Sequence, residues 1–148
     1  TVNWFYESKG DYASNINPPT FPDGLDVEVF RFSALCRAWH EAKLRSEREH
    51  VTPYIRSHPE IFTQANLQND TDLSHWRLTV DYEADFALVK IIYENLYENG
   101  KVFGLDDILG FLEKNSHLLE INQRLERNEG YVRSLAEDAI GQERTSGR

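Results

Sequence analysis

Three short segments of the chain combine charged side chains and turns at spacings that could do chemistry. The first is a tight turn that presents Asp23 and Gly24, followed by the alternating residues 25–30, which predict a β-strand. On that strand Asp26 and Glu28 share one face, about 7 Å apart at ~3.3 Å per residue. These carboxylates could bind sugar hydroxyls or a divalent cation. On spacing alone, the favoured interpretation is a turn aspartate followed by the solvated face of an edge strand.

The second segment places Arg48, His50 and Thr52 just before Pro53. A cation and a histidine near a helix start can meet a phosphate or carboxylate, helped by free backbone N–H groups. Taken alone, this segment favours the simpler interpretation, a charged helix entry with a solvated histidine.

The third segment, residues 76–80, alternates again and predicts a strand that contains Arg77 and ends at Asp81, just before a helix. Ligands of open α/β sheets bind beyond the carboxyl ends of strands, so we expect a metal ligand at Asp81. Asp81 could instead cap the following helix, or do both. Asp85, in the first helical turn, is interpreted as complementing the helix dipole.

The elements that must position these residues alternate along the chain. Strands are expected at residues 11–15, 25–30, 62–67 and 76–80, and helices at 34–43, 51–57, 83–98 and 106–115, the first of these capped by Ser33. Such alternation indicates an α/β layered fold. The sequence becomes polar after Ala136, so residues 136–148 are expected to form a tail or linker.

Composition excludes several classes of protein. The chain has 148 residues, with 16 basic and 25 acidic side chains and a net charge of −9, which argues against a binder of nucleic acid or anionic membranes. Its single cysteine excludes an intramolecular disulfide and a cysteine-cluster zinc site. No apolar run approaches the ~20 residues of a membrane span, so we expect a cytoplasmic domain. Because methionine is absent, we expect a processed product or a piece of a longer protein.

Together, the motifs resemble the cytidylyltransferase-like family, and most nearly its spore coat polysaccharide biosynthesis protein F type. The likeness is carried by residues 12–15, 21–30, 46–55, 78–81 with 85–86, and 128–131. It implies an α/β, Rossmann-like nucleotidyltransferase domain, a mixed sheet with flanking helices. It also implies magnesium-dependent transfer of a cytidylyl group from CTP to an acidic or modified sugar, in surface polysaccharide biosynthesis.

The resemblance further implies roles for individual residues. Asp81 would be the catalytic, magnesium-ligating aspartate. Segments 22–28 and 48–52 would line the sugar site, and Arg77 would lie near the same cleft. The substrate-binding residues are then expected to be Asp23, Gly24, Asp26, Glu28, Arg48, His50, Thr52 and Arg77.

The family's nucleotide-binding half and its other metal-binding aspartate have no counterpart in these residues. We therefore expect residues 1–135 to be the C-terminal portion of the family's domain, inactive alone and either self-associating as a homo-oligomer or needing the other half. Two alternatives remain open. One is a non-catalytic sugar- or protein-binding module, and the other is one domain of a multifunctional sugar-biosynthesis protein.

Overall fold

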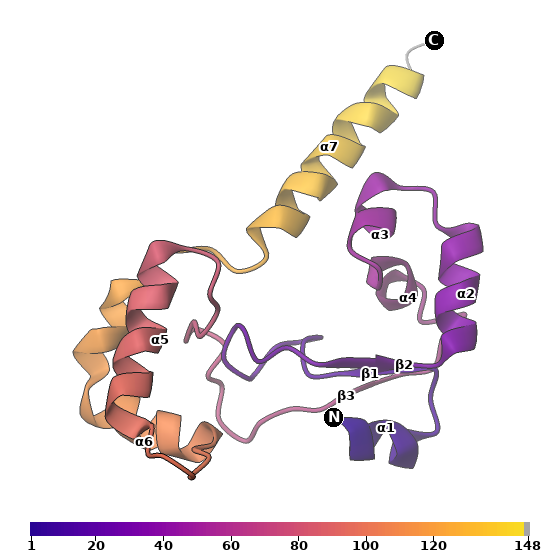
Figure 1. Cartoon of the computed structure of the whole chain (residues 1–148). Helices are drawn as coiled ribbons and strands as arrows, with labels where there is room; N and C mark the ends of the chain where they lie inside the picture. The colour runs from indigo at the N-terminus through magenta and orange to yellow at the C-terminus, as the bar shows by residue number, and fades with distance from the viewer. Residues whose placement is uncertain (147–148) are drawn as a thin grey trace. The chain divides into compact units, whose positions relative to one another are not determined.

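The computed structural model describes the backbone of residues 1–146 and the side chains of residues 1–141 (Figure 1). The chain divides into two compact units. The first contains residues 1–18, 27–67 and the segment from 126 onward, and the second contains residues 19–26 and 68–125. No helix in the described part of the chain is long and apolar enough to cross a membrane.

The first unit is built on a short three-stranded sheet in the order β2-β1-β3 (Figure 1). The central strand β1 (Tyr12–Ser14) runs antiparallel to β2 (Glu28–Phe30) and parallel to β3 (Gln64–Asn66). In this register Ala13 lies opposite both Val29 and Ala65. All three residues of β1 are buried, as expected of a central strand with both neighbours paired.

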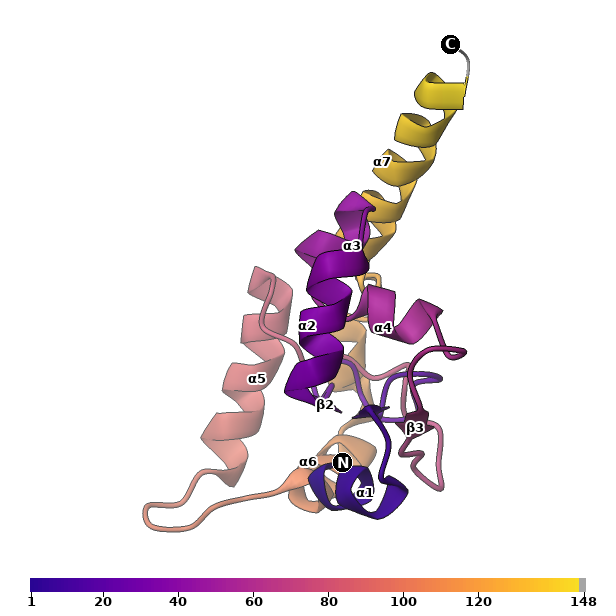
Figure 2. The ribbon, with the colours of Figure 1, turned by 90° about the vertical axis from the view of Figure 1, so that its right-hand side faces the viewer.

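Among the described residues, five helices complete the first unit. They are α1 (Val2–Ser8), α2 (Phe32–Glu41), α3 (Arg45–Glu49), α4 (Pro53–Ser57) and α7 (Glu129–Ser146). Helix α2 contacts α4, and α3 lies along α7 (Figure 2). The core lies where small residues of α2 let aromatic and aliphatic side chains approach, and it contains Tyr12, Ala34, Ala38, Ala42, Tyr54, Ile55 and Phe62.

The second unit is mainly helical. Helices α5 (Glu83–Leu96) and α6 (Leu105–Lys114) pack with the 3₁₀ helix η1 (Ser116–Ile121). Leu88, Ile92 and Leu112 of α5 and α6 form a separate hydrophobic core together with Trp76, which precedes these helices. The amphipathic patterns that predicted helices at 83–98 and 106–115 are therefore confirmed, with ends that differ by one or two residues.

The two strand predictions beside the proposed site are wrong in detail. The strand predicted at 25–30 begins only at Glu28, and residue 26 belongs to the second unit, so Asp26 and Glu28 do not share one face of a strand. Residues 76–80 form no strand; one isolated parallel bridge joins Arg77 to Asp23. Alternation alone could not show that most of these residues lack a neighbouring strand to pair with.

Three helix predictions also need correction. The helix predicted from residue 34, with Ser33 as its cap, begins at Phe32 with Arg31 at the N-cap. The charged residues 45–49, for which the sequence predicts a turn, form helix α3 instead. The helix predicted at 51–57 starts at Pro53, because Val51 takes a left-handed backbone conformation with φ of 68° that a helix cannot contain.

The predicted polar tail is helical as far as it is described. Helix α7 continues through residue 146, and residues 147 and 148 lie outside the described residues. Asp138, inside the predicted tail, accepts hydrogen bonds from the backbone N–H groups of Arg45 (3.0 Å) and Ser46 (3.2 Å). This part of the tail therefore caps the N-terminus of α3 in the first unit. A linker role for residues 136–148 stays a prediction.

Candidate functional site

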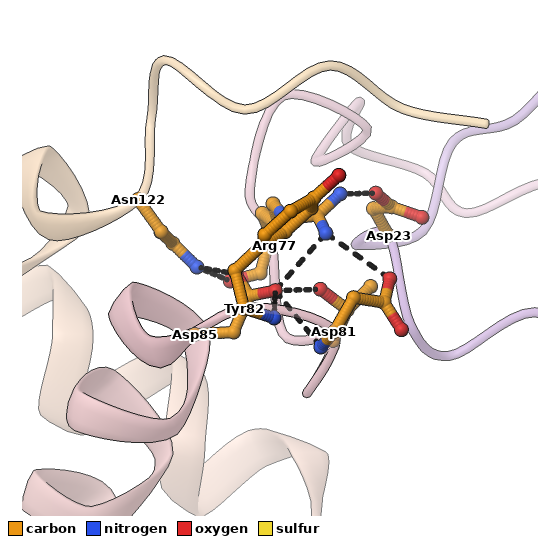
Figure 3. Close-up of polar contacts among 7 residues, drawn as sticks. Asp23, Arg77, Asp81, Tyr82, Asp85 and Asn122 are labelled. Carbon is orange, nitrogen blue, oxygen red and sulfur yellow. Dashed lines mark hydrogen bonds and ion pairs between the residues drawn. The ribbon is translucent and has the colours of Figure 1, made fainter. Parts of the chain in front are cut away.

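In the second unit, one buried arginine gathers three aspartates (Figure 3). The side chain of Arg77 is only 7% exposed. Its Nη1 donates to Asp23 Oδ2 at 3.0 Å, and its Nη2 donates to Asp81 Oδ2 at 3.1 Å. Its Nε and Nη2 also donate to the two carboxylate oxygens of Asp85, at 2.9 and 3.0 Å. We call these four residues the Arg77 cluster.

Asp85 is the most heavily hydrogen-bonded member of the Arg77 cluster, and its side chain is fully buried. Besides Arg77, its carboxylate accepts hydrogen bonds from Thr79 Oγ1 (2.8 Å) and from the backbone N–H groups of Asp81 (3.1 Å) and Tyr82 (3.2 Å). Burial raises the pKa of Asp85, but the hydrogen bonds from Arg77, from Asn122 and from Thr79 outweigh it and hold the pKa well below its usual range. Asp85 is therefore a buried, ionised carboxylate.

Asn122, the residue just after η1, also contacts the Arg77 cluster. It is buried, and its Nδ2 donates to the backbone carbonyl oxygen of Arg77 (3.0 Å) and to Asp85 Oδ1 (2.8 Å). The sequence analysis did not single out Asn122, because its partners lie 45 and 37 residues away. No local motif or charge pattern marks Asn122 in the sequence.

Asp81 differs from the other two aspartates because its side chain is 67% exposed. The ion pair with Arg77 thus fixes a carboxylate that still faces solvent. Magnesium is usually held by one or two carboxylates together with substrate phosphates. Asp81 could supply one such carboxylate. Within residues 1–141, no group of three His, Cys, Asp or Glu side chains could hold a metal ion by itself. Magnesium binding at Asp81 therefore stays a prediction.

The turn beside the Arg77 cluster requires glycine. Gly24 has a φ of 96°, and a Cβ atom there would lie 2.7 Å from the backbone carbonyl of Leu78. Any other residue would both strain the turn and push against that backbone. The turn keeps Asp23 against Arg77, while Asp26 is exposed.

The remaining predicted site residues lie in the first unit. Glu28 Oε1 accepts hydrogen bonds from Thr52 Oγ1 (2.7 Å) and from the hydroxyl of Tyr12. Burial, followed by the hydrogen bond to Glu28, raises the pKa of Tyr12 above its ordinary value. The structure thus brings Glu28 and Thr52 together, although the sequence separates them by 24 residues.

His50 and Arg48 point to different neighbours. The Nε2 of His50 lies 3.0 Å from Ser134 Oγ, and its ring meets the edge of Tyr131. Arg48 donates to the backbone carbonyl of Trp39 (3.1 Å) and its guanidinium lies 4.3 Å from the centre of the Trp39 ring. These two residues of the predicted sugar-binding segment therefore do not converge on one ligand position, and their substrate contacts stay predictions.

No family model matches the chain. It is 36% identical over 128 residues to an uncharacterised protein of Methanocaldococcus jannaschii. The matched region covers 84% of this chain and 50% of that protein. It is 26% identical over 113 residues to the spore coat polysaccharide biosynthesis protein SpsF of Bacillus subtilis, across 74% of this chain and 45% of that protein.

The fold is also similar to a solved structure, a cytidylyltransferase from Leptospira borgpetersenii. The TM-score is 0.73 with 28% identity, covering 84% of this chain and 51% of that one. The chain spans about half the length of the curated relatives it matches. In sequence and in fold, the chain is thus similar to about half of a cytidylyltransferase.

Proposed function

We propose that this chain is part of a cytidylyltransferase that joins the cytidylyl group of CTP to a sugar, giving a CMP-sugar and pyrophosphate. The observation that carries the proposal is the fold similarity to a cytidylyltransferase, with a TM-score of 0.73 over 84% of the chain at 28% identity. The similarity to SpsF supports a place in surface polysaccharide biosynthesis. An acidic or modified sugar and CTP are the proposed substrates, and the cytoplasm is the proposed compartment.

In this proposal the Arg77 cluster presents Asp81 to the reacting phosphates. Magnesium, when bound there, would neutralise phosphate charge during nucleotidyl transfer. Arg77 makes four hydrogen bonds to the three aspartates, so it would act by positioning Asp81 rather than by touching substrate. Asp85 and Asn122 would keep Arg77 in place.

The proposed sugar-binding residues are short polar side chains. The turn next to Arg77 contains the buried Asp23 and the exposed Gly24 and Asp26. Glu28 and Thr52 form a hydrogen-bonded pair. Because carboxylates accept hydrogen bonds from hydroxyl groups, these residues suit a polyhydroxy ligand. A net charge of −9 is compatible with an anionic nucleotide only if a metal or a few placed cations offset it.

The test is Asp81→Asn in the intact protein that contains this chain, assayed for pyrophosphate release from CTP with magnesium and a panel of sugars. We expect turnover to be lost, because the amide cannot replace the charged ligand. The free energy of unfolding should change by no more than about 1 kcal/mol, because Asp81 is an exposed partner of its ion pair.

Asp106→Asn is the matched control, since Asp106 is an exposed aspartate in the first turn of α6. It should leave turnover unchanged. Wild-type turnover by Asp81→Asn would remove Asp81 from the mechanism.

A further inference from the structure

Arg56, in α4 of the first unit, has hydrogen-bond donors that the described residues do not satisfy. Its Nε is buried and has no hydrogen-bond partner among them. The nearest carboxylate oxygen, Glu28 Oε1, is 4.0 Å away, which is too far for a hydrogen bond. The two terminal nitrogens also make no hydrogen bond to the described residues, but they are not among its buried unpaired atoms. The terminal end of the guanidinium is therefore open to a ligand.

Glu28 does not complete the coordination of Arg56, because its Oε1 already accepts two hydroxyl hydrogen bonds. These come from Thr52 (2.7 Å) and from Tyr12. Glu28 therefore places negative charge on the Nε side of Arg56 without binding its terminal nitrogens. An approaching anion would meet the opposite end of the guanidinium.

An aromatic ring holds Arg56 in a defined orientation. The guanidinium carbon of Arg56 lies 5.4 Å from the centre of the Tyr131 ring, a cation–π contact between α4 and α7. The ring of His50 contacts the same tyrosine edge-on, with centroids 5.3 Å apart. Although 23% of its side chain is exposed, Arg56 is thus a pre-oriented cation rather than a free surface side chain.

We propose that Arg56 binds an oxyanion, a carboxylate or phosphate group, through its terminal nitrogens. The planar guanidinium matches these groups with two parallel hydrogen bonds. The terminal nitrogens are not buried, so an oxyanion would replace water there with charge-assisted hydrogen bonds, which are stronger than neutral ones. If the oxyanion belongs to the sugar substrate, this inference rests on the proposed function. If it is free phosphate, the inference stands independently.

The experiment follows the arginine side-chain N–H signals of the full ¹⁵N-labelled chain by NMR. The chain is titrated with inorganic phosphate, glucuronate, glucose and sodium chloride, the last at matched ionic strength. We expect saturable shifts of the Arg56 signal with phosphate and glucuronate, and none with glucose or chloride. Absence of a saturable shift with both oxyanions would overturn the proposal and leave water as the partner of Arg56.

Arg56→Gln should weaken oxyanion binding roughly tenfold or more, since charge-assisted hydrogen bonds are lost. Arg37→Gln is the matched control. Arg37 also lies over an aromatic ring, that of Phe62 at 5.7 Å, but its Nε is already paired with Glu41 at 2.9 Å. The Arg37→Gln variant should leave oxyanion binding unchanged.

If Arg56→Gln does not fold, Arg56→Lys tests the same point, because it keeps the charge and loses the paired geometry. Undiminished binding in the folded variant would overturn the proposal.

The two ligands also distinguish the source of the oxyanion. Tighter binding of glucuronate than of phosphate assigns the site to a sugar acid, and the reverse assigns it to phosphate. Both results support an oxyanion site at Arg56. Because the readout is direct binding, it is separate from turnover of CTP, so failure here and failure of the proposed function are distinguishable.

Discussion

Two buried or half-buried arginines, one in each unit, differ in how far their hydrogen-bond donors are satisfied by neighbouring residues. In the second unit, Arg77 donates to Asp23, Asp81 and Asp85 at 2.9 to 3.1 Å. In the first unit, Arg56 has a carboxylate only at 4.0 Å and a buried Nε without a partner. An arginine thus completes a hydrogen-bond network in the second unit, whereas in the first unit an arginine keeps a donor that is not hydrogen-bonded.

The difference separates a structural arginine from a binding arginine. A guanidinium that already makes four hydrogen bonds to carboxylates has little remaining capacity for a ligand, however polar its neighbourhood. A guanidinium that is oriented by an aromatic ring but not hydrogen-bonded keeps that capacity. By this criterion we propose Arg77 as a positioning residue and Arg56 as a ligand-binding residue, although the sequence pattern draws attention to Arg77.

The largest expected effect is on stability, from Arg77→Met. The substitution leaves the ionised Asp85 buried without its cation, which typically costs about 3–5 kcal/mol. Urea unfolding followed by circular dichroism measures this change in the free energy of unfolding. A loss below about 1 kcal/mol would show that the Arg77 cluster does not hold the second unit together.

The pH dependence of stability should depend on Asp85. Because its folded-state pKa lies below the unfolded value of about 3.9, Asp85 stabilises the fold above that pH. This contribution is lost as the pH falls below about 4 toward the folded-state pKa. Unfolding of wild type and Asp85→Asn should be compared from pH 7 to pH 2. We expect the variant to be less stable at pH 7 and to lose less stability in acid; parallel curves would contradict the assigned role of Asp85.

The smallest expected effect is that of Arg56→Gln without ligand. The substitution removes a charge whose donors are unpaired, so the free energy of unfolding should change by no more than about 0.5 kcal/mol. The same urea unfolding measures it, in buffer free of phosphate and carboxylates. A loss comparable to that of Arg77→Met would mean that Arg56 is a second structural arginine, and the comparison between the units would fail.

The sequence predicted the helices better than it predicted the site. Helices α5 and α6 follow from apolar periodicity, which is local and is preserved by packing on one core. The break at Val51 has no local signal, because a β-branched residue rarely takes a positive φ. Residues 76–80 alternate like a strand, yet pairing depends on whether a neighbouring strand is present, which alternation does not reveal.

Within the candidate site, the sequence located the aspartates but not their organisation. Asp85 was interpreted as a helix-dipole residue, while the structure shows that its carboxylate binds Arg77 and Asn122 as well as the start of α5. Asn122 and Arg56 had no motif of their own. Their importance depends on distances to residues far away in the sequence, so only a three-dimensional structure reveals it.

The proposed activity is tested most directly by identifying its product. The intact protein, incubated with CTP, magnesium and a panel of acidic and neutral sugars, should be followed by ³¹P NMR. The account predicts that with one class of sugar, CTP disappears while pyrophosphate and a sugar-linked CMP phosphodiester form in equal amounts. Unchanged CTP with every sugar, or release of free CMP without a sugar adduct, would contradict the account.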